Sequence, residues 1–175
     1  MTAVVQSSEK QLSTRNLGED ARASDVLIHL VTFKLLGEEF GMPILDVREI
    51  IRMVAITPVP HAPKFVEGVI NLRGQILPVI DLRRRFNLDS TKTEEDTRII
   101  VVEISNSLLG LIVDGVKEVL RIPGDSVSPP PQIVANGIGA EYIKGIANYD
   151  NKMSILIDLK RVFSQDEMNS LERLE

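Results

Sequence analysis

Short apolar runs separated by turn residues follow one another along the chain from residue 26 to residue 163. The run at 26–33 is rich in strand-forming residues and leads into a glycine-containing turn at 37–39. A second apolar run at 40–42 then predicts the return strand of a β-hairpin. Because the runs are short and the turns are frequent, the pattern predicts a mainly β fold.

A longer hairpin is predicted near the middle of the chain. Strands at 66–70 and 75–82 flank a turn at 71–74. Asn71 at the first turn position and Gly74 at the fourth favour a type I turn, because Asn caps the turn and Gly accepts a positive φ. This hairpin is the clearest element in the sequence.

The segment after the first hairpin has an ambiguous pattern. Val47, Ile50 and Ile51 fall at helical spacing and are compatible with a short amphipathic helix, while a strand stays an alternative. The proline-rich stretches at 58–63 and 129–131 exclude a continuing helix. The same ambiguity holds for three apolar residues further along, Val116, Val119 and Leu120.

The two ends of the chain differ from this strand pattern. Residues 1–25 are polar with scattered apolar positions, so they cannot bury enough surface to offset the entropy of ordering, and a disordered tail is predicted. At the other end, Ser164 and Glu167 match a capping box. A helix is therefore predicted over 164–175, with an apolar face formed by Met168, Leu171 and Leu174.

The chain contains an internal repeat. The segment 66–86 is echoed without a gap by 143–163, at one constant offset (143 − 66 = 77). The segment 41–52 is echoed by 110–121, at a smaller offset (110 − 41 = 69). The repeat predicts two related units in one chain. Residues kept in both copies are expected to maintain the architecture, and residues that differ are where function is sought.

Composition narrows the possible function classes. A chain of 175 residues suffices for one domain with a real core, or for two small lobes that share one. The absence of cysteine excludes disulfides and thiolate metal sites. A net charge of -5 argues against general nucleic-acid binding. No apolar run approaches the ~18 residues of a membrane span, and the first residues do not resemble an export signal.

Candidate catalytic and metal-binding residues are few. His29 lies in a predicted strand and His61 in a proline-rich loop, so a shared metal site is not expected. Asp81 and Asp158 are candidate catalytic carboxylates, but they occupy one equivalent position in the two copies, which favours a bond to the backbone at a strand end. No nucleophile, base and orienting group can be assembled. The sequence therefore predicts neither an enzyme nor a cofactor.

Arginines are the remaining candidates for a functional site. The cluster at 83–85 is most simply a solvated segment after the long hairpin. Arg73 is different, because it stands at the centre of a predicted exposed turn and is replaced by Asp150 in the second copy (150 − 73 = 77). Arginine suits the recognition of carboxylates and backbone carbonyls, and it is enriched in binding hot spots. Arg73 is therefore the leading candidate for a binding residue.

The sequence around Arg73 resembles a known family. The run GVINLRGQILPVIDL at 68–82 is similar to the signature of the CheW family of bacterial chemotaxis coupling proteins, and of the related regulatory domain of the chemotaxis histidine kinase. The resemblance extends over about residues 25–167 and includes FGMPI at 40–44 and GLIVDGV at 110–116.

The resemblance implies two SH3-like five-stranded β-barrel lobes packed around a shared apolar interface. Short helices and a C-terminal helix would complete this fold. Taken together with the repeat, it implies a domain over 26–168, with lobe one over about 26–92 and lobe two over about 96–163.

The resemblance also implies a function without catalysis. Family members are cytoplasmic adaptors at membrane receptor arrays, where they join the cytoplasmic tip of methyl-accepting chemotaxis receptors to the regulatory domain of the histidine kinase. A groove between the lobes is expected to take the receptor's helical hairpin. Asn71 and Gly74 would shape the turn that holds Arg73, and the kinase-facing residues stay unassigned. Matched by position, the receptor-binding surface would include Val47, Glu49, Gly68, Arg73 and Gly110.

One alternative belongs to a different class, a β-barrel enzyme or nucleic-acid-binding module with its site between the lobes. The lack of a catalytic set disfavours the enzyme. Acidity and few aromatic residues disfavour the nucleic-acid binder. Direct insertion into a membrane is not expected either.

Overall fold

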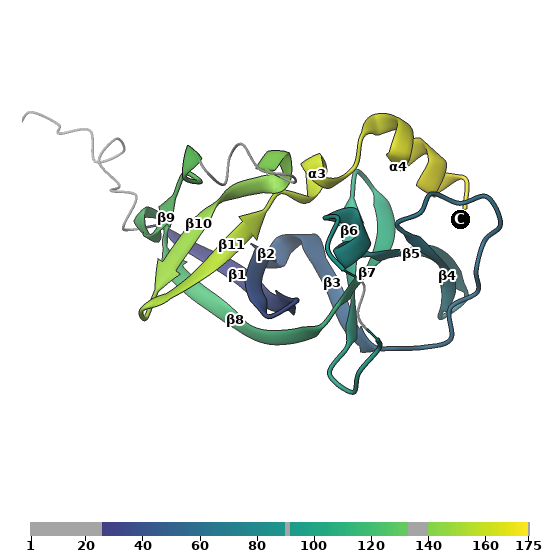
Figure 1. Ribbon diagram of the computed structural model, residues 1–175, viewed down its shortest axis with the longest axis horizontal. Coiled ribbons are helices and arrows are strands. Elements are labelled where there is room, and N and C mark those ends of the chain that lie inside the picture. Colours follow the sequence, from purple (N-terminus) through teal and green to yellow (C-terminus); the bar gives the residue numbers. More distant parts are fainter. Residues whose placement is uncertain (1–25, 90–91, 133–139, 175) are drawn as a thin grey trace, which may run out of the picture.

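The computed structural model describes residues 26–89, 92–132 and 140–174 of the chain. The predicted N-terminal tail over 1–25 lies outside the described residues. Two β-sheets dominate the molecule, one in each half of the view in Figure 1, and short helices follow some of the strands. The mainly β class predicted from the sequence is confirmed.

The sheet that we call lobe one has five strands in the order β3-β6-β7-β5-β4. Its neighbouring strands are antiparallel except for the parallel pair β5 and β7. A bridge between Thr57 and Val69 attaches the chain that leaves β3 to the outer side of β4, which curls the sheet towards a barrel. The strands are β3 (Val47–Arg52), β4 (Val66–Leu72), β5 (Gln75–Asp81), β6 (Arg98–Ile104) and β7 (Ser107–Val113).

The sheet that we call lobe two has six strands in the order β8-β1-β2-β11-β10-β9. Its parallel pair is β2 and β11, and its sixth strand, β9, has two residues and takes the place of the Thr57 bridge in lobe one. The strands are β1 (Leu27–Leu35), β2 (Glu38–Pro43), β8 (Gly115–Pro123), β9 (Val127–Ser128), β10 (Ile143–Tyr149) and β11 (Lys152–Ile157).

The two halves of the chain exchange their first hairpins. Hairpin β1–β2 pairs with β8 and β11 in lobe two, and hairpin β6–β7 pairs with β3 and β5 in lobe one. Figure 1 shows the purple strand β1 among the green strands of the second half. The predicted boundaries of the lobes, 26–92 and 96–163, are therefore wrong for these hairpins. A repeat identifies equivalent segments, but it does not reveal the copy with which each segment pairs.

The strand registers follow both offsets of the repeat. Val79 of β5 pairs with Gly110 of β7, and Leu156 of β11 pairs with Gly41 of β2. Val79 and Leu156 are equivalent positions of the repeat (156 − 79 = 77), and so are Gly41 and Gly110 (110 − 41 = 69). Each pairing in lobe one thus has its equivalent in lobe two, so the lobes can be compared position by position.

The structure settles two local questions. The ambiguous segment Val47–Arg52 is an edge strand in which half-buried and exposed residues alternate, and its counterpart in β8 is a strand as well. The turn after β4 is a two-residue loop of Arg73 (φ 52°) and Gly74 (φ 86°), which is a type I′ turn and not the predicted type I turn. Its counterpart in lobe two, Asp150 and Asn151, also has positive φ at both residues.

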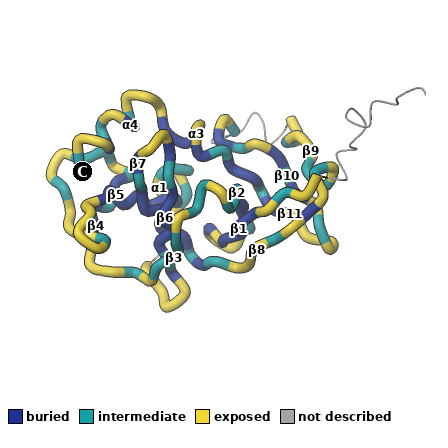
Figure 2. Tube along the Cα trace, turned by 180° about the vertical axis from the view of Figure 1, so that it is seen from behind, coloured by how far each residue is buried: buried dark blue, intermediate teal, exposed yellow. Residues whose placement is uncertain are grey.

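Each lobe has a small apolar core, and a larger core joins the lobes. Leu77 belongs to the core of lobe one and Leu30 to that of lobe two. The shared core combines residues of both lobes, such as Phe33 and Ile80, with Leu171 of the C-terminal helix. Figure 2 shows buried positions, in dark blue, continuing from one lobe into the other. The shared apolar interface predicted from the resemblance is confirmed.

Short helices follow the last strand of each copy. α1 (Leu82–Arg85) follows β5 and α3 (Leu159–Val162) follows β11. The side chains of Asp81 and Asp158 cap them by accepting a hydrogen bond from the backbone N–H two residues further on. Both carboxylates are therefore strand-end residues bonded to the backbone, as the repeat indicated.

The C-terminal helix α4 (Gln165–Glu172) starts at the predicted capping box. The side chains of Ser164 and Glu167 each accept a hydrogen bond from the other's backbone N–H. Met168 and Leu171 on its apolar face are buried. Within the described residues, three single 3-10 turns lie elsewhere, η2 (Ile44–Asp46), η3 (Gly124–Ser126) and η4 (Ala140–Tyr142).

Of the arginines at 83–85, predicted as a solvated segment, Arg84 is exposed, but Arg83 is buried and Arg85 is half buried. Arg83 is 3% exposed and forms ion pairs of 3.0 Å with Asp81 and with Asp114, at the end of β7. Arg85 forms an ion pair of 2.8 Å with Glu167 of α4. Asp81 is a neighbour in the sequence, but Asp114 and Glu167 are brought to these arginines by the tertiary fold, so the local run of charge gave no sign of them.

Candidate binding groove

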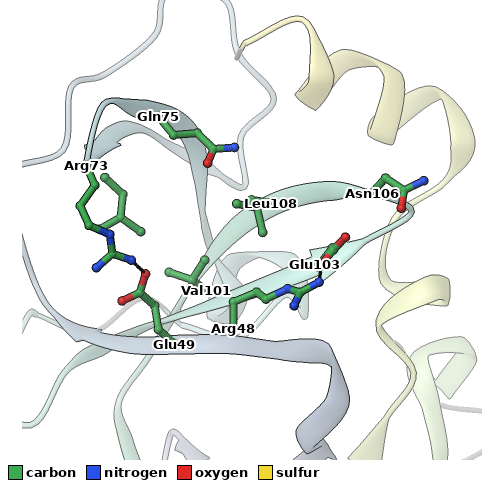
Figure 3. Close-up of a pocket in the computed structure, with 9 residues that line it drawn as sticks. Arg48, Glu49, Arg73, Gln75, Val101, Glu103, Asn106 and Leu108 are labelled. Atoms are coloured by element: carbon green, nitrogen blue, oxygen red, sulfur yellow. Dashed lines mark hydrogen bonds and ion pairs between the residues drawn. The ribbon is translucent and has the colours of Figure 1, made fainter.

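A groove of about 700 Å³ opens on lobe one. Figure 3 shows it between edge strand β3 on one side and the β4–β5 hairpin on the other, with β6 and β7 beneath. Both halves of the sequence therefore contribute to it, because β6 and β7 are the exchanged hairpin. The groove is lined by Arg48, Glu49, Leu72, Arg73, Gln75, Val101, Glu103, Asn106 and Leu108.

A β-bulge brings two consecutive residues of β3 to the groove. Val47 pairs with Val102 and Glu49 pairs with Val101, so Arg48 is the extra residue on β3. Neighbours in a regular strand point to opposite faces, whereas a bulge disturbs this alternation and redirects a side chain. Arg48 and Glu49 accordingly both line the groove.

The type I′ turn places Arg73 at the mouth of the groove. The Asn71 side-chain oxygen accepts a hydrogen bond of 2.8 Å from the backbone N–H of Gly74 and holds the turn. The Arg73 side chain is 74% exposed and forms an ion pair with Glu49, whose side chain is 29% exposed. Since β3 and β4 are the two edges of the sheet, this ion pair links the β4–β5 turn to the opposite edge (Figure 3).

Apolar side chains form the floor of the groove. Val101 is buried, and Leu72 and Leu108 are half buried. A second ion pair joins Arg48 of β3 to Glu103 of β6. Figure 3 shows Val101 between the two ion pairs. The groove thus combines an apolar floor with guanidinium groups on either side, which is chemistry suited to recognition of another molecule.

The five residues predicted at a receptor-binding surface divide into two groups. Glu49 and Arg73 line the groove. Val47 is half buried and packs against the shared core, immediately before the bulge. Gly68 and Gly110 are buried. The structure therefore brings the first two together and places the other three in the surrounding framework.

Both glycines permit a close approach of neighbouring strands. A Cβ atom on Gly68 would overlap the carbonyl oxygen of Thr57, in the segment that bridges to β4. A Cβ atom on Gly110 would lie 2.8 Å from Cγ2 of Ile99 and 3.3 Å from Cγ2 of Val79, on the two strands beside β7. Glycine at these positions is thus required by the packing of the sheet that carries the groove.

Seven of the nine lining residues were not identified from the sequence. A signal was present in the repeat, where Glu103 is replaced by Lys34 (103 − 34 = 69) and Leu108 by Glu39 (108 − 39 = 69). Changes of charge and polarity mark these positions, as they mark Arg73. The sequence could not place Glu103 and Leu108 beside Arg73, because they belong to the other copy of the repeat.

The equivalent positions of lobe two hold a polar cluster. Glu39 accepts hydrogen bonds from the Tyr149 hydroxyl, from Ser154 Oγ at 2.7 Å and from Lys117 Nζ at 3.1 Å. Burial raises the pKa of Glu39, but the hydrogen bonds outweigh it and lower that pKa below its ordinary value. Burial and the bond to Glu39 raise the pKa of Tyr149 to about 12. Mutually bonded polar side chains thus occupy the place of the apolar floor.

The part of the chain that the structure describes offers no metal site. No group of three or more His, Asp or Glu residues there is arranged to hold a metal ion. His29 in β1 and His61 in the loop before β4 are both exposed. No helix in the described ranges is long and apolar enough to cross a membrane.

Comparisons with known proteins give consistent matches. Residues 29–167 match the family model of the CheW-like domain. The chain is 36% identical over 155 residues to the chemotaxis protein CheW of Treponema pallidum, covering 86% of this chain and 91% of that protein. It is also 36% identical over 136 residues to the chemotaxis protein CheW of Klebsiella aerogenes, covering 78% of this chain and 81% of that protein.

A solved structure supports the same relationship. The crystal structure of the scaffolding protein TtCheW from Thermoanaerobacter tengcongensis matches with a TM-score of 0.74 and 43% sequence identity. The match covers 81% of this chain and 96% of that protein's chain. The chain is thus similar to these relatives in sequence and to the TtCheW structure in fold.

Proposed function

The chain belongs to the CheW family, and from this membership we propose that it is a non-enzymatic adaptor in bacterial chemotaxis. It joins the cytoplasmic tip of methyl-accepting chemotaxis receptors to the regulatory domain of the chemotaxis histidine kinase. Its place is the cytoplasm, at membrane receptor arrays. The names of its relatives, chemotaxis protein CheW and scaffolding protein, support this role.

One observation carries the receptor-binding part of the proposal. Arg73 stands 74% exposed on a two-residue turn, beside a groove with an apolar floor. The equivalent turn of lobe two carries Asp150, and the floor positions there are polar. The combination of a presented guanidinium and an apolar floor is therefore specific to one lobe, although both lobes share one scaffold.

The groove, which lies on lobe one and not between the lobes as the resemblance implied, suggests how a receptor helix is bound. The apolar stripe of the receptor helix packs against Leu72, Val101 and Leu108, as an amphipathic helix packs in a hydrophobic groove. Arg73 donates hydrogen bonds to a carboxylate or carbonyl of the helix. Giving up the ion pair with Glu49 costs little, because exposed ion pairs are worth at most about 1 kcal/mol.

Simultaneous binding of receptor and kinase gives the adaptor its effect. Held by one scaffold, the two partners meet at a raised effective concentration. Differential contacts with two conformations of the kinase would also shift its population towards one of them. Neither effect requires a catalytic group.

Titration of a purified receptor signalling fragment against wild type and Arg73→Glu tests this proposal. We expect the substitution to weaken binding by at least ~2 kcal/mol, about 30-fold, which is the scale of a hot-spot residue. Thermal unfolding should change little, because the side chain is exposed. The matched control is Asp150→Lys at the equivalent turn of lobe two, which should leave receptor affinity unchanged.

A pull-down with the receptor fragment and the kinase regulatory domain tests the adaptor role as a whole. Wild type should retain both partners at once. Unaltered receptor affinity of Arg73→Glu would remove Arg73 from the binding surface, and failure to retain either partner would refute the adaptor function.

A further inference from the structure

The second ion pair of the groove has the same construction as the first. The side chain of Arg48 is 59% exposed and forms an ion pair with that of Glu103, which is 28% exposed. The side chain of Arg73 is 74% exposed and forms an ion pair with that of Glu49, which is 29% exposed. In each case a half-buried carboxylate orients an arginine that stays accessible to a partner. Figure 3 shows the two pairs on either side of Val101.

The Arg48–Glu103 pair contributes little to the stability of the sheet. β3 and β6 are already joined by backbone pairing along the strand. Exposed ion pairs add at most about 1 kcal/mol, because water screens the charges and ordering the side chains costs entropy. The guanidinium of Arg48 can therefore turn to a carboxylate of a partner at small cost, as proposed for Arg73.

Lobe two supplies an internal comparison for both pairs. Lys117 and Lys34 occupy the positions of Arg48 and Glu103, at the same register and bulge (48 + 69 = 117; 103 − 69 = 34). A pair of opposite charges in lobe one has thus become two positive charges in lobe two. Lys117 is moreover directed to Glu39, which stands in the place of Leu108.

The other pair changes in the same way. Asp150 and Glu118 occupy the positions of Arg73 and Glu49 (73 + 77 = 150; 49 + 69 = 118). An ion pair of lobe one has become two negative charges. Hence both arginine–carboxylate pairs, together with the apolar floor between them, are features of lobe one alone, and they form one coherent surface.

We propose that Arg48 is a second specificity-determining residue of this groove, and that the bound receptor segment carries a carboxylate on each side of its apolar stripe. One carboxylate meets Arg73 and the other meets Arg48, while the apolar stripe covers Val101 and Leu108. Bidentate bonds from both arginines fix the register of the segment in the groove. The inference rests on the proposed function, because it assumes that the groove takes the receptor.

Titration of the receptor signalling fragment against the full chain provides the test. Arg48→Glu should bind at least about tenfold more weakly, as expected for loss of a hot-spot arginine. The double variant Arg48→Glu with Glu103→Arg restores an ion pair between β3 and β6 in reverse. It should stay as weak as the single variant, because the charge offered to the partner at position 48 is still reversed.

Arg52→Glu is the matched control. Arg52 is an exposed arginine on the same strand and is absent from the lining of the groove, so its substitution should change affinity by less than about twofold. Arg48→Gln removes the charge without reversing it and serves as the second test variant should Arg48→Glu fold poorly.

Three results would overturn the inference. Wild-type affinity of Arg48→Glu or Arg48→Gln would show that the side chain makes no contact, and recovery of affinity in the double variant would assign it a structural role between strands. Equal losses of affinity for Arg48→Glu and Arg52→Glu would show that the effect comes from the net charge of the surface and not from a contact at position 48. If Arg73→Glu weakens binding in the same series, these results leave the proposed function standing. If wild type itself fails to bind the fragment, both proposals fall.

Discussion

Arg83 joins the two lobes through buried charges, and its removal should have a large cost. Its Nε and one terminal nitrogen donate to the two oxygens of Asp81 at 3.0 and 3.2 Å, and the other terminal nitrogen donates to Asp114 at 3.0 Å. Asp114 also accepts a hydrogen bond from the backbone N–H of Leu36, in the β1–β2 turn. Arg83 thus connects the end of β5 in lobe one to the exchanged hairpin of lobe two. The perturbation is Arg83→Met, which keeps an apolar stem and removes the charge.

The magnitude follows from the burial of the partners. The side chains of Arg83 and Asp81 are 4% and 2% exposed, whereas Asp114 is 22% exposed. Without Arg83, the Asp81 carboxylate loses both hydrogen bonds from the guanidinium in a site that water hardly reaches, and Arg84 remains at 3.7 Å. Breaking a buried pair by removing one partner costs roughly 3–5 kcal/mol. At about 2–4 °C per kcal/mol for a chain of this size, the midpoint of thermal unfolding should fall by roughly 6–20 °C.

Urea unfolding followed by circular dichroism measures the loss, with thermal unfolding as a second reading. The matched control is Lys160→Met, at the equivalent position of lobe two, where the lysine is exposed and its substitution should cost less than about 0.5 kcal/mol. A destabilisation of Arg83→Met below about 1 kcal/mol, similar to that of the control, would refute the assigned role of the buried ion pairs.

Two further predictions concern packing and titration. Gly68→Ala should destabilise the fold by roughly 1–3 kcal/mol in urea unfolding. The loss should be larger than for Gly145→Ala, because the new Cβ would overlap a backbone oxygen at Gly68 and would lie 2.7 Å from one at Gly145. Equal losses of stability for the two variants would contradict this prediction. Tyr149 should titrate near pH 12 by ultraviolet absorbance, and stability should fall between about pH 10 and 12, because the unfolded chain releases the proton first. Tyr149→Phe should remove this part of the fall, and an unchanged pH profile would count against the shift.

Much of the fold follows from local signals in the sequence. Strand propensity and turn residues predict the hairpin at 66–82, and it is found as β4 and β5. The capping box at Ser164 predicts the start of α4 for the same reason, since a cap depends on residues within one turn. The predicted type I turn at 71–74 was wrong because Arg73 has φ 52°. An arginine seldom adopts this conformation, and its sequence neighbours do not reveal it.

The parts that escaped prediction depend on contacts between distant segments. Val47–Arg52 has apolar residues at both helical and strand spacing, and its pairing with β6 decides in favour of a strand. Arg83 is buried with two partners, and one of them, Asp114, lies between β7 and β8 in the other half of the sequence. For the candidate groove, the charge reversal at Arg73 was visible in the repeat, whereas its partner Glu49 could be named only from the family resemblance.

The exchanged hairpins explain why the groove cannot be deduced from either copy of the repeat alone. Glu103 and Leu108 reach it on β6 and β7, which belong to the second half of the sequence and to the first lobe of the structure. Strand β7 then continues through Asp114 into β8 of lobe two, and the backbone N–H of Asp114 donates to Lys34 of β1. Each lobe is therefore completed by strands that the other half supplies, so neither can open without disturbing both sheets. In an adaptor of the proposed kind, this shared construction sets the geometry between the sites of two bound partners, and that geometry decides whether both can bind at once.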